Sequence, residues 1–90
     1  MKYEAMYIVR PTLEEAVRDS LIAEVNGVFS NVSEVNAWGM RNLAYPIEDH
    51  TQGYYVITQV EANPSEVDEF ERVCRIKEDI IRFIIVKQDE

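Results

Sequence analysis

The fold is decided by residues 38–47, WGMRNLAYPI, together with residues 53–57, GYYVI. Both stretches are rich in aromatic and branched apolar residues, which favour extended backbone. Pro46 is expected to close the first strand and Gly53 to open the second, with a polar loop between them. The pair predicts two neighbouring strands. A strand that carries Arg41 and Tyr45 beside one rich in aromatic residues makes a surface suited to a polyanion or a protein partner.

Two further strands are predicted outward from this pair, because apolar residues recur there with a period of two. The four strands are expected over residues 3–9, 32–45, 54–61 and 80–87. The second strand is long by ordinary standards, and Gly39 within it marks a bulge or a twist. The chain therefore has one strand near each end and two in the middle.

Two helices are predicted in the remaining segments. The first is expected to begin at a capping box formed by Thr12 and Glu15 and to run to about residue 30. The second is expected to begin with Asn63 as its N-cap and Pro64 at its first position. Their buried stripes are expected to comprise Leu13, Val17, Leu21, Val25, Val28 and Phe29 in the first helix, and Val67, Phe70, Val73 and Cys74 in the second.

The order strand, helix, strand, strand, helix, strand predicts an α+β protein with the ferredoxin-like split βαβ fold. Its four-stranded antiparallel sheet carries both helices on one face. Residues 1–90 are expected to form a single domain, in which residues 88–90 are a short, frayed acidic tail.

The face of the sheet without helices is expected to be open. By alternation it carries Glu4, Met6, Ile8, Tyr55, Ile57, Gln59, Arg82, Ile84 and Val86. A contiguous exposed apolar area of this kind usually marks a partner surface. The sequence therefore predicts a protein partner on Met6, Ile8, Tyr55, Ile57, Gln59, Ile84 and Val86, or on the adjoining sheet edge; the alternative is that loops or the tail cover part of this face.

Charge limits the nature of the partners. Nine Lys and Arg residues stand against seventeen Asp and Glu, for a net charge of −8. Such a chain cannot generate a strong nonspecific field for a nucleic acid, because phosphate binding depends on cations. Either the protein does not bind RNA, or it binds within a complex whose basic partner supplies the positive potential.

Catalytic and metal-binding functions are not expected. The chain has one histidine, His50, and one cysteine, Cys74, so neither a catalytic Cys–His or Ser–His–Asp set nor a Cys/His zinc site is predicted. His50 is expected to be a solvated loop residue and Cys74 a small buried side chain on a helix. No cofactor, metal, membrane or DNA partner is expected, and the short apolar runs favour a cytoplasmic location.

The order of the motifs resembles a known family. Residues 38–47 and 53–55 are similar to the pattern W-G-(basic)-R-(basic)-L-A-Y-x-I followed by G-(Y/F)-(Y/F), which is typical of the sixth protein of the bacterial small ribosomal subunit. Residues 2–11, KYEAMYIVRP, and residues 76–87, IKEDIIRFIIVK, resemble the two ends of that family. The resemblance covers essentially the whole chain, and its specificity lies in the order and spacing of the motifs.

The resemblance implies a non-catalytic scaffold protein that binds the central domain of small-subunit ribosomal RNA together with the small, basic ribosomal protein eighteen. We expect RNA contacts from cations and hydrogen-bonding neighbours at strand ends and edges: Lys2, Tyr3, Arg41, Asn42, Tyr45, Arg82 and Lys87. Arg41 has the strongest case, because it matches the arginine of the family pattern. Met40 and Asn42 stand where family members often carry Lys or Arg.

A regulatory or homo-oligomerising ferredoxin-like module that binds a small ligand is the alternative function. Its open face would pair with a second copy of the chain, so a tight homodimer in solution would favour it.

Overall fold

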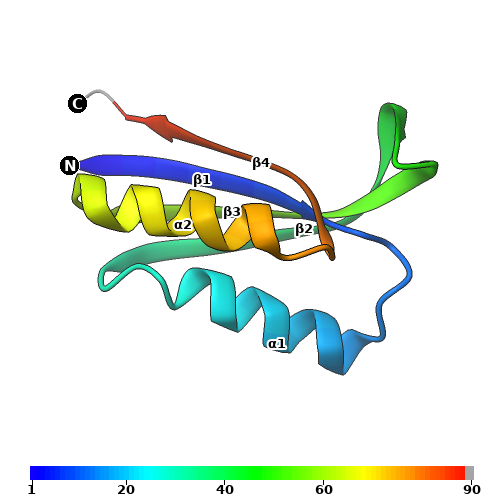
Figure 1. Cartoon of the computed structure of the whole chain (residues 1–90), viewed down its shortest axis with the longest axis horizontal. Helices are drawn as coiled ribbons and strands as arrows, with labels where there is room; N and C mark the ends of the chain where they lie inside the picture. The colour runs from blue at the N-terminus through cyan, green and yellow to red at the C-terminus, as the bar shows by residue number, and fades with distance from the viewer. Residues whose placement is uncertain (89–90) are drawn as a thin grey trace.

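The structure, a computed structural model, describes residues 1–88 and confirms the predicted order of elements (Figure 1). The elements are β1 (Lys2–Val9), α1 (Glu15–Asn26), β2 (Val32–Ile47), β3 (His50–Glu61), α2 (Pro64–Ile76) and β4 (Ile80–Lys87). The strands form one antiparallel sheet in the order β2-β3-β1-β4, so β2 and β4 are its edges. Of the expected acidic tail, the backbone N–H of Gln88 donates to the carbonyl of Lys2 at 2.8 Å, whereas Asp89 and Glu90 lie outside the described residues.

The hydrophobic core lies between the sheet and both helices, as alternation along the strands predicts. Phe70 of α2 is fully buried at its centre. Its ring lies 5.4 Å from that of Phe29, 6.1 Å from that of Tyr7 and 6.2 Å from that of Phe83, measured between centroids. These tilted and edge-on contacts are the favoured arrangements of aromatic rings, so Phe70 joins α2 and the segment after α1 to the sheet.

A buried polar network fixes the end of α1 against the sheet. The side-chain carbonyl of Asn26 accepts hydrogen bonds from the Tyr7 hydroxyl at 2.7 Å and from the Thr58 hydroxyl at 3.1 Å. Burial raises the pKa of Tyr7 far above its ordinary value, so this side chain stays a neutral donor. Each hydroxyl thereby has the partner that a buried polar group needs.

The start of α2 is as predicted. The Asn63 side chain accepts from the backbone N–H of Glu66, and the Glu66 carboxylate accepts from the backbone N–H of Asn63. The same carboxylate also accepts from the backbone and hydroxyl of Ser30, at 2.8 and 2.9 Å. These hydrogen bonds lower the pKa of Glu66 and connect the α1–β2 loop to α2.

The ends of α1 differ from the prediction. The helix begins at Glu15 behind an N-cap of Glu14 that makes no side-chain cap bond, so the expected capping box of Thr12 is wrong. The helix ends at Asn26 rather than near residue 30. The chain leaves the helix at Gly27, which lets Phe29 turn inward to reach the core. Tertiary packing here overrides the helical spacing of the apolar residues.

The β2–β3 hairpin is longer and tighter than expected. Its connection consists of Glu48 and Asp49, both with positive φ (49° and 67°), between the paired residues Ile47 and His50. The register is interrupted between Asn42 and Ile47, so Pro46 lies inside β2 rather than closing it. The chain beyond the interruption forms an arm, residues 43–52, that rises from the plane of the sheet at the right of Figure 1.

Candidate functional site

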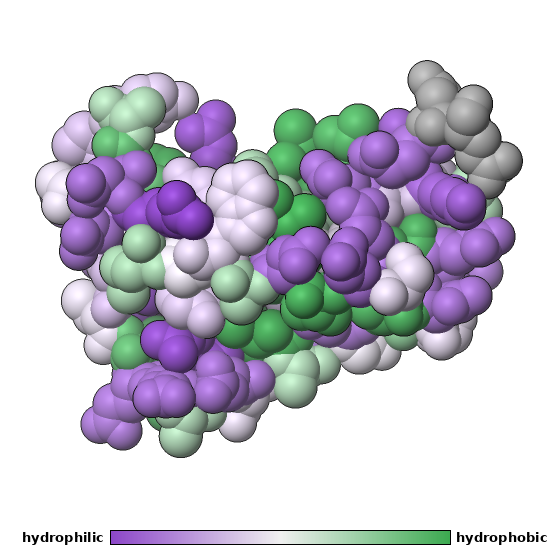
Figure 2. Space-filling model, turned by 180° about the vertical axis from the view of Figure 1, so that it is seen from behind, coloured by the Kyte–Doolittle hydropathy of each residue, from purple (hydrophilic) through white to green (hydrophobic). Residues whose placement is uncertain are grey.

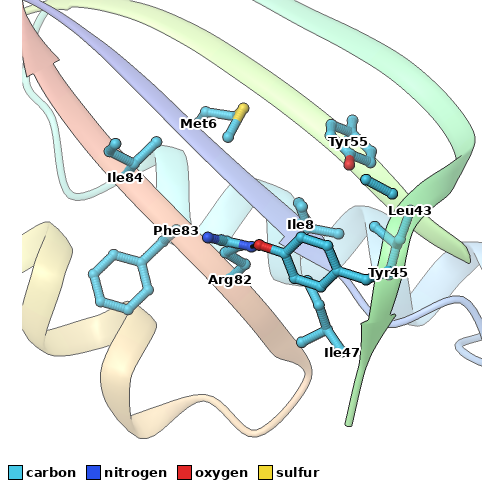
Figure 3. Close-up of a pocket in the computed structure, with 10 residues that line it drawn as sticks. Met6, Ile8, Leu43, Tyr45, Ile47, Tyr55, Arg82, Phe83 and Ile84 are labelled. Carbon is cyan, nitrogen blue, oxygen red and sulfur yellow. Dashed lines mark hydrogen bonds between the residues drawn. The ribbon is translucent and has the colours of Figure 1, made fainter. Parts of the chain in front are cut away.

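The hairpin arm bends over one end of the sheet face that the helices leave uncovered, and a groove of about 360 Å³ lies between the two. Its lining comes from three strands and the arm: Met6, Ile8, Leu43, Ala44, Tyr45, Ile47, Tyr55, Arg82, Phe83 and Ile84 (Figure 3). We call this space the sheet-face groove. Figure 2 shows the arm as a raised lobe at the upper left, with a dip between it and the apolar surface at the centre.

Gly53 allows the arm to approach the sheet. It is buried inside β3 instead of opening that strand, and a Cβ atom built on it would lie 2.3 Å from Cγ2 of Ile8 and 3.6 Å from Cδ2 of Leu43. A side chain at this position would displace Ile8, since contacts that close are not tolerated between packed carbons. The glycine therefore sets the depth of the groove.

The expected open face is only partly open. Ile8 is 2% exposed because the arm covers it, and Ile57 is 8% exposed because it lies between its register partners, Met6 of β1 and Asn36 of β2. These two members of the predicted partner face are buried, which corrects the expectation that they are free for contact. The alternative that a loop covers part of this face is correct at the arm.

The exposed apolar surface that remains is concentrated toward β4. Ile84 is 50% exposed, and Val86 is nearly as exposed. Between β1 and β3 a hydrogen bond of 2.7 Å from the Gln59 amide to the Glu4 carboxylate crosses the same face. Ile84 pairs in register with the half-buried Met6, so the groove continues into an apolar strip along the β4 edge. Such a strip, next to a groove, is a surface on which an apolar partner can be buried.

Arg82 and Tyr45 join the arm to β4 across the mouth of the groove. A guanidinium N–H of Arg82 donates to the Tyr45 hydroxyl oxygen at 3.1 Å, and the guanidinium carbon lies 5.9 Å from the ring centroid. Figure 3 shows the guanidinium directed at this hydroxyl. The hydrogen bond, and secondly the positive charge, lower the pKa of Tyr45, while the same contact raises the pKa of Arg82. The pair is exposed, so it positions the arm rather than stabilising the fold strongly.

The Tyr45–Arg82 contact can be tested by titration. We expect Tyr45 to ionise at a lower pH than an ordinary tyrosine, because the guanidinium stabilises the phenolate. The difference in ultraviolet absorbance between the wild-type chain and Tyr45→Phe, recorded against pH, isolates this side chain. In an Arg82→Gln background the same difference curve is expected to move to higher pH.

Arg72→Gln is the matched control, since Arg72 pairs with Glu69 on the exposed side of α2 and is not in contact with Tyr45. Its difference curve is expected to coincide with that of the wild type. Equal titration of Tyr45 with and without Arg82 would show that the contact is absent in solution.

The seven predicted RNA-contacting residues form two groups. Arg41, Asn42, Tyr45 and Arg82 lie around the arm, whereas Lys2, Tyr3 and Lys87 lie at the opposite end of the sheet, where Tyr3 pairs with Lys87. In the first group Asn42 accepts a hydrogen bond of 3.1 Å from Gln52, and Arg41 contacts Trp38. The structure thus brings four of the seven together and leaves three elsewhere.

Trp38 is an exposed aromatic residue that was not predicted from the sequence as a contact residue. Its side chain is half exposed, and the Arg41 guanidinium lies over its ring. The spacing of three residues between a tryptophan and an arginine was visible in the sequence. However, alternation along a regular strand would place residues 38 and 41 on opposite faces, and only the bulge brings them together.

Among the residues that the structure describes, the side chains that could bind a metal or react chemically include Cys74 and His50. Within residues 1–88, no three His, Cys, Asp or Glu side chains gather closely enough to hold a metal ion. Cys74 is buried in α2 as predicted, and burial raises the pKa of its thiol to about 12. His50 is half-buried as the first residue of β3 rather than fully solvated in a loop.

None of the helices described for residues 1–88 is long and apolar enough to cross a membrane.

A family model described as Ribosomal protein S6 matches residues 2–87. The chain belongs to this family. It is also similar to the solved structure of the 30S ribosomal protein S6 from Thermotoga maritima, with 26% sequence identity and a TM-score of 0.92. The similarity covers 97% of this chain and 86% of the other. The family resemblance and the fold expected from the sequence are therefore confirmed.

Membership of the ribosomal protein S6 family gives the chain a structural role in the small ribosomal subunit and thus in translation. Its function is non-enzymatic, as the absence of a catalytic constellation in the sequence led us to expect. As a component of the subunit, this ribosomal protein is associated with ribosomal RNA.

Proposed function

We propose that this S6-family protein binds the central domain of small-subunit ribosomal RNA jointly with the basic ribosomal protein eighteen. The sheet-face groove and the β4 strip would hold the protein partner, and the pair would then hold an RNA junction in place. In this proposal the chain acts as one folded domain in the ribosome of the cytoplasm.

The main observation in support of the proposal is that an acidic protein exposes apolar side chains on its sheet. Ile84 and Val86 remain exposed beside the groove, so a partner that covers them removes apolar surface from water. The net charge of −8 attracts a basic protein and opposes RNA, which favours a basic protein as the first occupant. The basic partner would then supply the cations that this chain lacks.

RNA contacts from the chain itself are proposed at both ends of the sheet. Arg41 and Arg82 at the arm, and Lys87 at the opposite end, are exposed cations that can reach phosphate oxygens. The apolar strip lies between these ends, so an RNA strand or junction could contact both while the partner covers the middle. Tyr3, Asn42 and Tyr45 are the hydrogen-bonding neighbours in this proposal, and Lys2 completes the second group.

Binding of a central-domain RNA fragment, measured with and without the purified basic protein over a range of salt concentrations, tests the proposal. We expect tight binding only when both proteins are present. The logarithm of the affinity falls linearly with that of the salt concentration, and the magnitude of this slope should decrease by about 0.7–0.9 for each phosphate contact that is removed by mutation. Arg41→Gln is therefore expected to flatten the slope by about one contact, and the control Arg72→Gln is expected to leave it unchanged.

Failure of the two proteins to associate, combined with a stable homodimer of this chain at low micromolar concentration, would contradict the proposal. That result would mean that a second copy of the chain covers the apolar strip.

A further inference from the structure

Trp38, the one tryptophan of the chain, lies where the pairing of the edge strand β2 with β3 is irregular. The register with β3 shifts between Ala37 and Gly39, so Trp38 is the extra residue of a β-bulge. Gly39 has a φ of 83°, and no atom would lie within 4 Å of a Cβ built on it. Backbone conformation rather than lack of space therefore requires glycine there. Bulges of this kind re-aim a side chain, and here the side chain is a tryptophan that is 52% exposed.

Arg41 is held against this tryptophan. Its Nε–H donates to the Trp38 carbonyl oxygen at 3.3 Å, and its guanidinium carbon lies 5.6 Å from the centre of the indole ring. No carboxylate forms an ion pair with Arg41 within residues 1–88, although acidic residues outnumber basic ones almost two to one. Its positive charge is thus available to an external anion, and the residue is exposed.

We propose that Trp38 and Arg41 form a stacking platform for an unpaired RNA base, in which Arg41 also contacts the phosphate next to that base. This inference rests on the proposed RNA-binding function and assigns it a specific contact. An exposed aromatic ring accepts any base, because every base has a π face, and an adjacent guanidinium adds both cation–π attraction and a phosphate contact.

Two observations favour RNA over a protein at this point. Trp38 does not line the sheet-face groove, so it lies outside the apolar surface assigned to the protein partner. Beyond Arg41 the strand continues toward the arm with a polar pair, since Asn42 and Gln52 are hydrogen-bonded to each other and exposed. An arginine without an ion-pair partner beside a half-exposed ring fits a nucleotide better than it fits an apolar side chain of a protein.

The environment of Trp38 can be followed directly by fluorine NMR. We would incorporate 5-fluorotryptophan into this chain alone and record the fluorine resonance of the chain, of its complex with the basic protein, and of that complex with the RNA fragment. The resonance is expected to change little when the protein partner is added and to shift when the RNA is added. A shift caused by the protein alone, with no further change on addition of RNA, would overturn the inference and make Trp38 a protein contact.

Affinity measurements on variants complete the test. Trp38→Ala is expected to weaken binding of the complex to RNA by about 5- to 150-fold, the range that corresponds to loss of one stacked base, while Trp38→Phe keeps most of the affinity. Met40→Ala, which removes a 43% exposed side chain two residues along β2, is the matched control and is expected to change the affinity by less than about twofold. Because both side chains are exposed, the folding of these variants is expected to match that of the wild type.

The two proposals fail in different ways. If the wild-type complex binds RNA and Trp38→Ala binds equally well, the stacking platform is overturned and the proposed function stands. If the wild-type complex does not bind RNA at all, the proposed function is overturned, and the platform with it.

Discussion

Replacing Phe70 by alanine is expected to lower the free energy of unfolding by about 3–5 kcal/mol. The ring is fully buried and contacts Tyr7, Phe29 and Phe83, which come from β1, the segment after α1, and β4. Alanine would leave a cavity that the three surrounding rings could fill only by moving from their packed positions. Because a small domain has a total stability of roughly 5–15 kcal/mol, the loss is large enough to unfold part of the population at physiological temperature.

Urea denaturation followed by circular dichroism measures this loss. Ile76→Ala is the matched control on the same helix, because Ile76 is 61% exposed and its truncation is expected to change the stability by less than about 0.5 kcal/mol. A loss below about 1 kcal/mol for Phe70→Ala would mean that the three-ring core is not formed as described.

Replacing Ile84 by aspartate is expected to weaken binding of the basic ribosomal protein eighteen by about 100-fold or more. Ile84 lies in the middle of β4, half exposed, where the sheet-face groove meets the apolar strip. A partner that covers this position would bury an unpaired carboxylate, and the cost of its desolvation exceeds the gain from a general attraction to a basic protein. Isothermal titration calorimetry of the two purified proteins measures the effect.

Ile76→Asp is the control, since it makes the same change of residue and charge at an exposed position of α2. We expect its affinity for the partner to equal or slightly exceed that of the wild type, because the added negative charge favours encounter with a basic protein. Equal weakening by both substitutions would indicate a nonspecific charge effect, and no weakening by Ile84→Asp would place the partner elsewhere.

Most of the fold could be predicted because local signals and long-range packing agree. The alternation in β1 and β4, the capping box of Asn63 and Glu66, and the apolar stripe with Phe70 each point to the element that forms. Where a local sequence signal was not supported by packing, the prediction made from it was wrong. Thr12 has the chemistry of an N-cap, yet the helix begins at Glu15, because capping contributes only about 1 kcal/mol and packing decides where the chain turns.

The candidate site was less predictable. The sequence indicated which residues face away from the helices, since alternation alone determines this in β1, β3 and β4. It could not indicate that Ile8 is covered, because this depends on how closely the arm approaches the sheet. That approach is set by the contact between Gly53 and Ile8, which are more than forty residues apart in the sequence. It also could not join Arg82 to Tyr45, which belong to different edges of the sheet.

The sequence by itself determined the order of elements, the helix-bearing face, the acidic charge and the family to which this protein belongs, because periodicity, composition and motif order are local or additive properties. Only the tertiary structure decided the depth of the groove, the buried state of Ile8, and the meeting of Trp38 with Arg41. Each of these depends on a bend or a bulge in one strand. A bulge changes which side chains share a face. The identities of Gly39, at the bulge, and Gly53, where the arm approaches the sheet, do not by themselves reveal how far the chain will bend.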